Sequence, residues 1–133
     1  MAELSPEVRA FLSEKRFAAL ATINKDGTPQ QTPMWYDLDG EIILMNTAAG
    51  RLKHRNLLRD PRASFCVVDG YRWVTVIGTV ELNDNQVVAQ ADIRRLAIRY
   101  HGPEKGDRQA RESFSKQQRV TIHLKVEQVM SGL

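Results

Sequence analysis

Six basic or imidazole side chains lie between residues 51 and 62, shortly after the apolar run EIILM. They are Arg51, Lys53, His54, Arg55, Arg59 and Arg62. Arginine offers paired hydrogen bonds to an anion and lysine offers a point charge. Asn46 and Thr47 precede the stretch and can cap a helix whose N-terminus adds free N–H groups. We therefore predict a phosphate-type anion site, which the small residues 48–50 would let an anion approach closely.

A solvated basic helix face is the alternative interpretation of the same stretch. Basic helix faces are common, and exposed ion pairs with carboxylates such as Asp60 or Glu41 contribute little to stability. The residue pattern alone favours neither interpretation over the other.

A second cluster comprises Thr32, Pro33, Met34 and Trp35. Pro33 cannot donate to a strand ladder, so we expect it at an edge or a bulge. An unpaired backbone beside sulfur and aromatic side chains suits a flat heterocycle, although Met34 or Trp35 alone is more often a core residue. One predicted hairpin separates this cluster from Met45–Thr47, so we expect the two sets on neighbouring strands.

The sequence lacks the usual catalytic sets. His54, His101 and His123 have neither the spacing of metal ligands nor a pattern of carboxylate partners. The lone Cys66 lies in an apolar run, where a thiol is most often a small buried hydrophobe. The sequence contains no phosphate-binding loop, dinucleotide fingerprint or serine-hydrolase elbow. We predict no metal site, and if the chain is an enzyme, a cofactor supplies the chemistry.

Hydrophobic periodicity and turn residues predict the elements that must position these side chains. Helices are predicted at residues 5–15, 50–59, 84–102 and 107–116. Strands are predicted at residues 16–24, 30–38, 41–46, 62–69, 72–82 and 119–130. Asp-Gly pairs favour hairpins between the first three strands, which would form a meander. The sequence predicts a mainly β fold, a six-stranded antiparallel barrel with flanking helices, as one domain over residues 1–133.

The hydrophobic content, the net charge and the single cysteine restrict the class of protein. A hydrophobic content of 42% in 133 residues is enough for a packed core. The net charge of +3 suits an anionic ligand but is too small for a nucleic-acid coat. No run approaches the roughly 20 apolar residues that span a bilayer, and one cysteine cannot form an internal disulfide. We expect a soluble cytoplasmic protein with neither a nucleic-acid nor a membrane partner.

The segment from Ala19 to Asp69 resembles the pyridoxamine-phosphate-oxidase-like split-barrel family, which binds FMN and related flavins. The resemblance extends over nearly the whole chain. Its features are the turn DGTPQ, the strand that ends before Thr47, the run KHRNL at residues 53–57 and the segment RDPRASF. Within the family, the chain is most similar to the branch that uses the deazaflavin coenzyme F-420. The resemblance implies F-420 or, as the alternative, FMN, held at the interface of a homodimer.

The resemblance also implies roles for individual residues. Those expected at the cofactor phosphate are Thr47, Gly50, Arg51, Lys53 and Asn56. Those expected along the isoalloxazine-like ring are Thr32, Pro33, Met34, Met45 and Asn46, with Trp73 approaching from the partner subunit. Those expected near an acidic F-420 tail are Arg55, Arg59 and Arg62.

The predicted function is hydride transfer from reduced F-420 to an electron-poor small molecule such as an enone, a quinone or an unsaturated tetrapyrrole. Tyr36 is the candidate proton donor. The sequence ends at VEQVMSGL, where a true pyridoxamine-phosphate oxidase has a further substrate-binding segment, so vitamin B6 oxidation is not expected. The alternatives are an FMN-binding oxidoreductase, or a flavin or haem carrier or sensor without turnover in which His54 or His123 would matter. Nucleic-acid binding through the basic helix ranks last.

Overall fold

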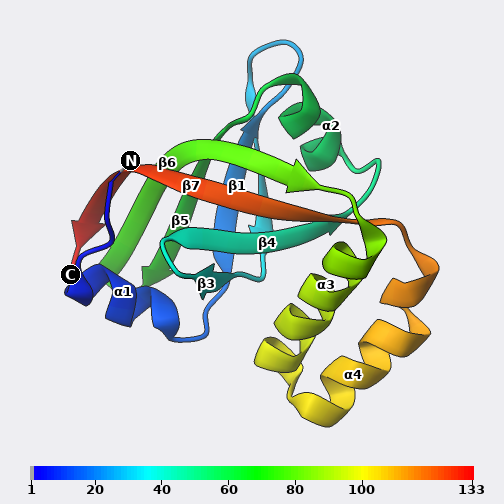
Figure 1. The fold of residues 1–133 in the computed structure, drawn as a ribbon. Coiled ribbons are helices and arrows are strands. Elements are labelled where there is room, and N and C mark those ends of the chain that lie inside the picture. Colours follow the sequence, from blue (N-terminus) through cyan, green and yellow to red (C-terminus); the bar gives the residue numbers. More distant parts are fainter. Residues whose placement is uncertain (1) are drawn as a thin grey trace.

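The computed structural model describes residues 2–133 and shows a curved antiparallel sheet with helices around it (Figure 1). The strands are β1 (Ala18–Ile23), β2 (Pro29–Met34), β3 (Asp37–Asp39), β4 (Ile42–Ala48), β5 (Arg62–Asp69), β6 (Arg72–Asn83) and β7 (Arg119–Gly132). The helices are α1 (Pro6–Ser13), α2 (Leu52–Arg59), α3 (Gln86–His101), α4 (Pro103–Glu112) and the short 3-10 helix η1 (Phe114–Lys116). The seven strands are hydrogen-bonded in the order β2-β1-β5-β6-β7-β4-β3. The predicted antiparallel, mainly β architecture is therefore confirmed.

The predicted strand at residues 30–38 is in fact two strands at opposite edges of this sheet. β2 pairs with β1, whereas β3 pairs with β4. Between them, the Tyr36 N–H donates to the Tyr100 hydroxyl at 3.1 Å, and Arg99 Nε donates to the Tyr36 carbonyl at 3.0 Å. Side chains from α3 thus bind the backbone groups that a continuous strand would need. The predicted count of six strands and the three-strand meander are wrong for this reason, while Pro33 lies on an edge strand as predicted.

Two helices begin close to their capping residues, whereas the predicted caps of the basic helix are wrong. Asn46 and Thr47 lie within β4, and α2 instead begins after Arg51, whose side chain makes no capping hydrogen bond. The Ser5 hydroxyl accepts from the Val8 N–H at 3.2 Å and caps α1. The Asn85 side chain caps α3 by accepting from the N–H groups of Val87 and Val88, so the helix begins at Gln86, two residues after the predicted start at residue 84. The last predicted helix begins earlier than expected, because Pro103 directly after Gly102 is already a favourable first helical residue.

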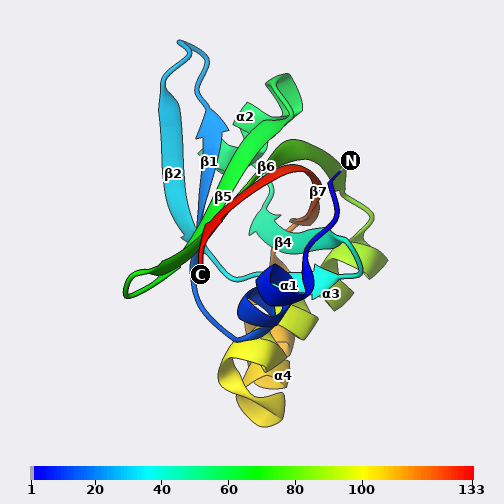
Figure 2. The same cartoon turned by 90° about the vertical axis from the view of Figure 1, so that its left-hand side faces the viewer.

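The core is built from the alternating side chains of the long strands. Val120, Ile122, Leu124 and Val126 on β7 are all buried, as their spacing predicts. The register between β6 and β7 shifts at Gly78, where a Cβ would lie only 1.8 Å from the Lys125 carbonyl oxygen. This close approach requires glycine, and β6 and β7 curve together around the core (Figure 2). No helix within residues 2–133 has both the length and the apolar character needed to cross a bilayer.

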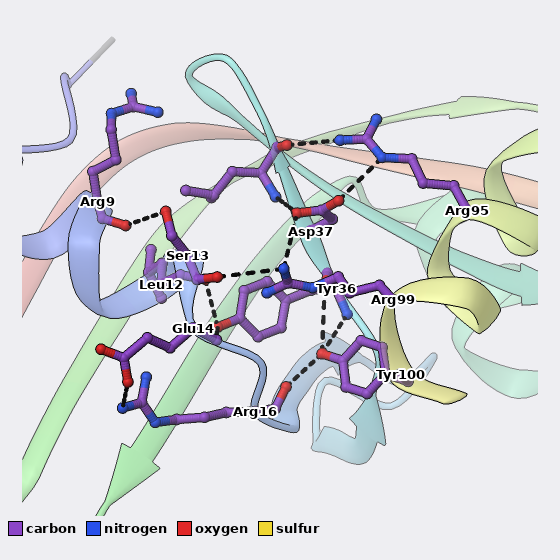
Figure 3. Close-up of polar contacts among 11 residues, drawn as sticks. Arg9, Leu12, Ser13, Glu14, Arg16, Tyr36, Asp37, Arg95, Arg99 and Tyr100 are labelled. Atoms are coloured by element: carbon purple, nitrogen blue, oxygen red, sulfur yellow. Dashed lines mark hydrogen bonds and ion pairs between the residues drawn. The ribbon is translucent and has the colours of Figure 1, made fainter. Parts of the chain in front are cut away.

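A buried polar network fixes α3 to the end of α1 and to the crossover between β2 and β3 (Figure 3). The Tyr36 hydroxyl donates to the Leu12 carbonyl at 2.9 Å, and the Tyr100 hydroxyl donates to the Arg16 carbonyl. The Tyr36 ring is fully buried and packs edge-on against Phe65. These contacts hold residue 35, the neighbour of Tyr36, in one position relative to α3.

Ion pairs at one carboxylate extend the network toward the surface. Asp37 accepts from Arg95 Nε at 3.1 Å and lies 3.4 Å from Arg99 Nη1. The same Arg99 binds the Tyr36 carbonyl, so one side chain joins the crossover to the first residue of β3. Together with the tyrosine contacts, this pairing sets the angle at which the chain passes from one edge of the sheet to the other.

The Tyr36 hydroxyl makes the stability of this network dependent on pH. Burial raises the pKa of Tyr36 to about 12, and Tyr100 adds to the shift. A folded-state pKa above the unfolded value near 10 means that the contribution is complete below pH 10 and is lost as the pH rises toward 12. We expect the wild-type protein to lose roughly 2 kcal/mol more unfolding free energy over this interval than Tyr36→Phe. Urea unfolding at several pH values measures this difference, and identical pH slopes for the two proteins would contradict it.

Candidate functional site

A cavity of about 250 Å³ lies where the ends of β2 and β4 meet the first turn of α2 and one face of α3. Its polar lining residues are Asn46, Thr47, Arg51, Lys53 and Arg119. Its apolar lining residues are Phe17, Pro33, Met34, Trp35, Ile93, Leu96 and Phe114. β2 and β4 share no hydrogen-bonded ladder, so the two predicted clusters meet across a gap between strands and not on neighbouring strands.

Three cations gather at the polar end of the cavity without a carboxylate partner. Lys53 is 7% exposed and Arg119 is 4% exposed, while Arg51 lies at the surface. Within residues 2–133, none of the three forms an ion pair. Burial lowers the pKa of Lys53, and the charges of Arg51 and Arg119 lower it further. Burial and the nearby Arg51 lower the pKa of Arg119 to about 10.

Uncharged donors complete this polar end. The Thr47 hydroxyl oxygen is buried and has no hydrogen-bond partner within the described chain. Helix α2 begins after Arg51, whose side chain makes no capping hydrogen bond, so the first N–H groups of the helix lack a side-chain acceptor. An anion with several oxygens would satisfy the hydroxyl, the helix N-terminus and the cations together. This donor set fits a phosphate group.

The other end of the cavity is a wall of aromatic and aliphatic side chains. Trp35 stacks on Tyr100 with ring centroids 5.3 Å apart and meets the edge of Phe114 at 6.3 Å. Ile93 and Leu96 of α3 add aliphatic surface. Flat apolar surface beside an anion site is the arrangement that a planar ring with a phosphate-bearing chain would need.

Comparison with known proteins agrees with this geometry. Residues 4–131 match the family of pyridoxamine 5'-phosphate oxidase. The chain belongs to this family. The resemblance that residues 19–69 carry is thereby confirmed, and with it the split-barrel fold class.

Individual relatives of the pyridoxamine 5'-phosphate oxidase family are similar over nearly their whole length. An F-420H(2)-dependent biliverdin reductase of Mycobacterium tuberculosis is 32% identical over 132 residues, which cover 97% of this chain and 88% of that protein. A conserved hypothetical protein of the same organism superposes with a TM-score of 0.82 at 30% identity, covering 98% of this chain and 84% of that one. An F-420 reductase superposes with a TM-score of 0.75 at 27% identity, covering 92% and 94% of the two chains.

The structure brings together about half of the residues that the family resemblance suggested for the cofactor. Those that line the cavity are Pro33, Met34, Asn46, Thr47, Arg51 and Lys53. Met45 is instead fully buried in the core, and Thr32 lies in a separate surface hollow with Cys66. Trp73 is exposed on β6, outside the cavity, and its approach from a partner subunit remains a prediction.

Two residues expected at the phosphate have other partners. The Gly50 N–H donates to His54 Nδ1 at 2.9 Å, in a turn whose φ of +88° favours glycine. The Asn56 side chain donates to the Thr22 hydroxyl at 3.1 Å and to Asn24 Oδ1 at 2.9 Å, and so fixes α2 to β1. Gly50 forms the turn before α2, and Asn56 attaches α2 to the neighbouring strand β1. Neither residue lines the cavity.

Tyr36 is poorly placed for the proton-donor role that we expected. Its hydroxyl faces the Leu12 carbonyl at the end of α1, and the side chain is fully buried outside the cavity lining. Its pKa, raised to about 12, makes it a weak acid. Tyr36 therefore belongs to the buried network between α1 and α3 and does not line the cavity, and its proton-donor role stays a prediction.

The outer arginines divide between the two interpretations of the basic stretch. Arg62 forms a forked pair with Asp60, with a shortest distance of 2.7 Å, as a solvated ionic surface would. Arg59 donates to the Ile23 carbonyl and to Asn56 Oδ1. Arg55 is exposed and has no ion pair within the described residues, and it lines a shallow hollow beside the β1–β2 turn with Lys25. The start of α2 thus has the unpaired cations that the anion interpretation requires, whereas Arg62 beyond its end forms the surface ion pair of the alternative.

Sequence reasoning missed five lining residues, which are Phe17, Ile93, Leu96, Phe114 and Arg119. The spacing of Ile93 and Leu96 marked an apolar helix face, but it could not say that this face covers a cavity. Arg119 begins a strand in which the alternate residues look outward-facing. No local signal shows that α3 and η1 cover it.

Removal of the buried charge of Lys53 should have opposite effects on stability and on anion binding. In phosphate-free buffer we expect Lys53→Met to raise the unfolding free energy by roughly 1 kcal/mol, because it replaces an unpaired buried cation with an apolar side chain of similar length. The same change should weaken binding of inorganic phosphate about tenfold, since it removes a charge-assisted contact.

Denaturant unfolding and calorimetric titration measure the two effects. Arg62→Met is the matched control, because Arg62 is exposed and already paired with Asp60. A Lys53→Met protein that is less stable and still binds phosphate like the wild type would place the anion elsewhere.

Proposed function

We propose that this protein is an oxidoreductase that uses coenzyme F-420 to transfer a hydride to an electron-poor small molecule. The observation that carries the proposal is one cavity in which a cationic end without carboxylates adjoins a flat apolar wall. Similarity to an F-420H(2)-dependent biliverdin reductase and to an F-420 reductase supports this choice of cofactor. When bound, F-420 supplies the hydride from its reduced deazaflavin ring.

The side chains of this chain would bind and orient. Lys53, Arg51 and the Thr47 hydroxyl would hold the phosphate, and the segment Pro33–Trp35 would lie along the ring. The described lining contains no histidine, cysteine, tyrosine or carboxylate. We therefore propose that the protein contributes positioning and exclusion of water, without a protein nucleophile.

The substrate that we propose is a conjugated, electron-poor molecule such as an enone, a quinone or an unsaturated tetrapyrrole. The name of the biliverdin reductase relative supports the tetrapyrrole, and the apolar wall formed by Trp35 and Phe114 suits any of these planar molecules. FMN is the second candidate cofactor, because a phosphate cradle without carboxylates fits its phosphate equally well. In either case we propose that residues 1–133 act as a single cofactor-binding domain.

We further propose a homodimer. Large apolar side chains are exposed around the β5–β6 turn and near the end of β7, where β6 and β7 pair. They are Val68, Tyr71, Trp73, Ile77 and Met130. A contiguous apolar surface of this kind is unusual on a monomer, and a second copy of the chain would cover it. Trp73 would then be available to the partner's cofactor, as the family resemblance implies.

Salt dependence should distinguish the two cofactors. F-420 has carboxylates beyond its phosphate and FMN does not, so we expect F-420 to bind more tightly at low ionic strength and its advantage to shrink as salt is added. Beyond Arg51 and Lys53, the exposed Arg55 is the next cation along α2 that has no ion pair within the described residues, and Arg55→Ala should weaken F-420 binding about two- to fivefold. Arg62→Ala is the matched control, because Asp60 already neutralises that side chain.

Quenching of F-420 fluorescence measures these affinities. The protein should also purify without colour from a host that lacks F-420. A yellow preparation with stoichiometric FMN, which leaves F-420 fluorescence unchanged, would exclude F-420 and favour FMN.

A charge placed on the apolar surface should break the dimer. We expect Trp73→Glu to shift the protein from dimer to monomer in light scattering at micromolar concentration and to weaken cofactor binding. Val87→Glu is the matched control, because Val87 is 82% exposed on α3, away from that surface. A wild-type protein that is a stable monomer and still binds the cofactor would refute the interface site.

A further inference from the structure

Arg119, the first residue of β7, is a buried cation that the predicted function does not use. Its Nε donates to Asn46 Oδ1 at 2.9 Å, and its Nη1 donates to Gln117 Oε1 at 2.6 Å. The guanidinium lies over the Phe114 ring, 4.9 Å from the centroid. The side chain is only 4% exposed and lines the cavity. It therefore faces whatever the cavity binds.

The supports of Arg119 are themselves fixed. The Asn46 amide donates to the Ala89 carbonyl of α3 at 3.0 Å, so its oxygen is oriented toward the guanidinium. The Gln90 side chain donates to the Gln117 carbonyl at 2.9 Å and holds the segment before β7. Figure 1 shows this start of β7 beside α3. The guanidinium is thus positioned before any ligand arrives.

Both side-chain acceptors of Arg119 are neutral amides. Buried arginines are normally paired with an anion, because an uncompensated buried charge is costly. Within residues 2–133, Arg119 has no carboxylate partner, and its Nη2 makes no hydrogen bond. Two amide oxygens that accept from the guanidinium and the Phe114 ring hold the group, while its charge remains unbalanced.

The described cavity lining carries positive charge that no negative group in it balances. Arg51, Lys53 and Arg119 bring three positive charges to one end of the cavity, and the lining supplies no negative charge. The phosphodiester of F-420 would supply one. Further anionic oxygens would balance the remainder.

We propose that Arg119 is a third anion-binding residue of the cavity and contacts a phosphate or carboxylate oxygen of a bound ligand. The proposal rests on the proposed function only in taking this cavity as the binding site. Two sources have the required chemistry. One is the anionic part of the cofactor, and the other is a carboxylate of a planar substrate that stacks beside Phe114.

Titration calorimetry of the full chain tests the proposal with four probes: inorganic phosphate, F-420, biliverdin and biliverdin dimethyl ester. We expect Arg119→Gln to weaken at least one anionic probe about tenfold or more, as the loss of a charge-assisted hydrogen bond predicts. Arg119→Lys should recover part of the loss, because it restores the charge without the fork. Arg111→Gln is the control, since Arg111 pairs with Asp107 on the surface of α4.

The pattern of losses identifies the source of the anion. Loss of affinity for phosphate and F-420 assigns Arg119 to the cofactor. Loss for biliverdin alone, with its dimethyl ester and F-420 unchanged, assigns Arg119 to a substrate carboxylate. Folded Arg119→Gln protein that binds every anionic probe like the wild type would overturn the proposal.

The wild-type protein gives a second test, by NMR, that does not require the Arg119 variants to fold. The Arg119 Nε resonance should shift when inorganic phosphate or biliverdin is added, and a resonance that moves with neither probe would also overturn the proposal. If the wild type fails to bind F-420 but binds phosphate in an Arg119-dependent way, the cofactor assignment fails while the anion site stands.

Discussion

The hydrogen bonds between side chains of α3 and the backbone of Tyr36 are the interaction on which the rest of this structure depends. Arg99 donates to the carbonyl of Tyr36 and the Tyr100 hydroxyl accepts from its N–H. Because these groups are then unavailable to a strand ladder, the strand that contains Pro33 ends before Tyr36. The chain must then cross to the other edge of the sheet. That crossing opens the gap between β2 and β4, turns Trp35 into the cavity and brings α3 over it. Long-range hydrogen bonds from α3 to two backbone groups of one residue thus create the site.

The cavity that results is costly for the folded protein. Lys53 and Arg119 are buried without a counter-charge, and the Thr47 hydroxyl lacks a partner. Natural cores rarely keep such groups, since each one lowers the stability of the ligand-free state. A ligand that neutralises them binds the native state alone. It therefore raises the free energy of unfolding, and it raises it more when it binds more tightly. The unfavourable electrostatics of the free protein would therefore favour binding of the anion that we propose.

The fold of the pyridoxamine 5'-phosphate oxidase family does not by itself choose a cofactor or a substrate. The phosphate cradle at the start of α2 would accept FMN or F-420, because both carry a phosphate next to a flexible chain and a flat ring. Selection must come from groups around the cradle, such as the exposed Arg55 and the buried Arg119. Function here is set by side chains placed on a shared scaffold.

The sequence by itself determined the strands with alternating side chains, the cap of α1 and the basic start of α2, because these depend on neighbours within a few residues. It also placed Arg51 and Lys53 in one predicted anion site, and these two residues, which are close in the chain, line the same cavity. It could not show the break at Tyr36, whose partners on α3 are more than sixty residues away. Nor could it show that Arg119 is buried in the same cavity as Arg51 and Lys53, since α3 and η1 cover that residue only after the sheet has curved. Burial and charge compensation are properties of the packed chain, and only the tertiary structure decided them.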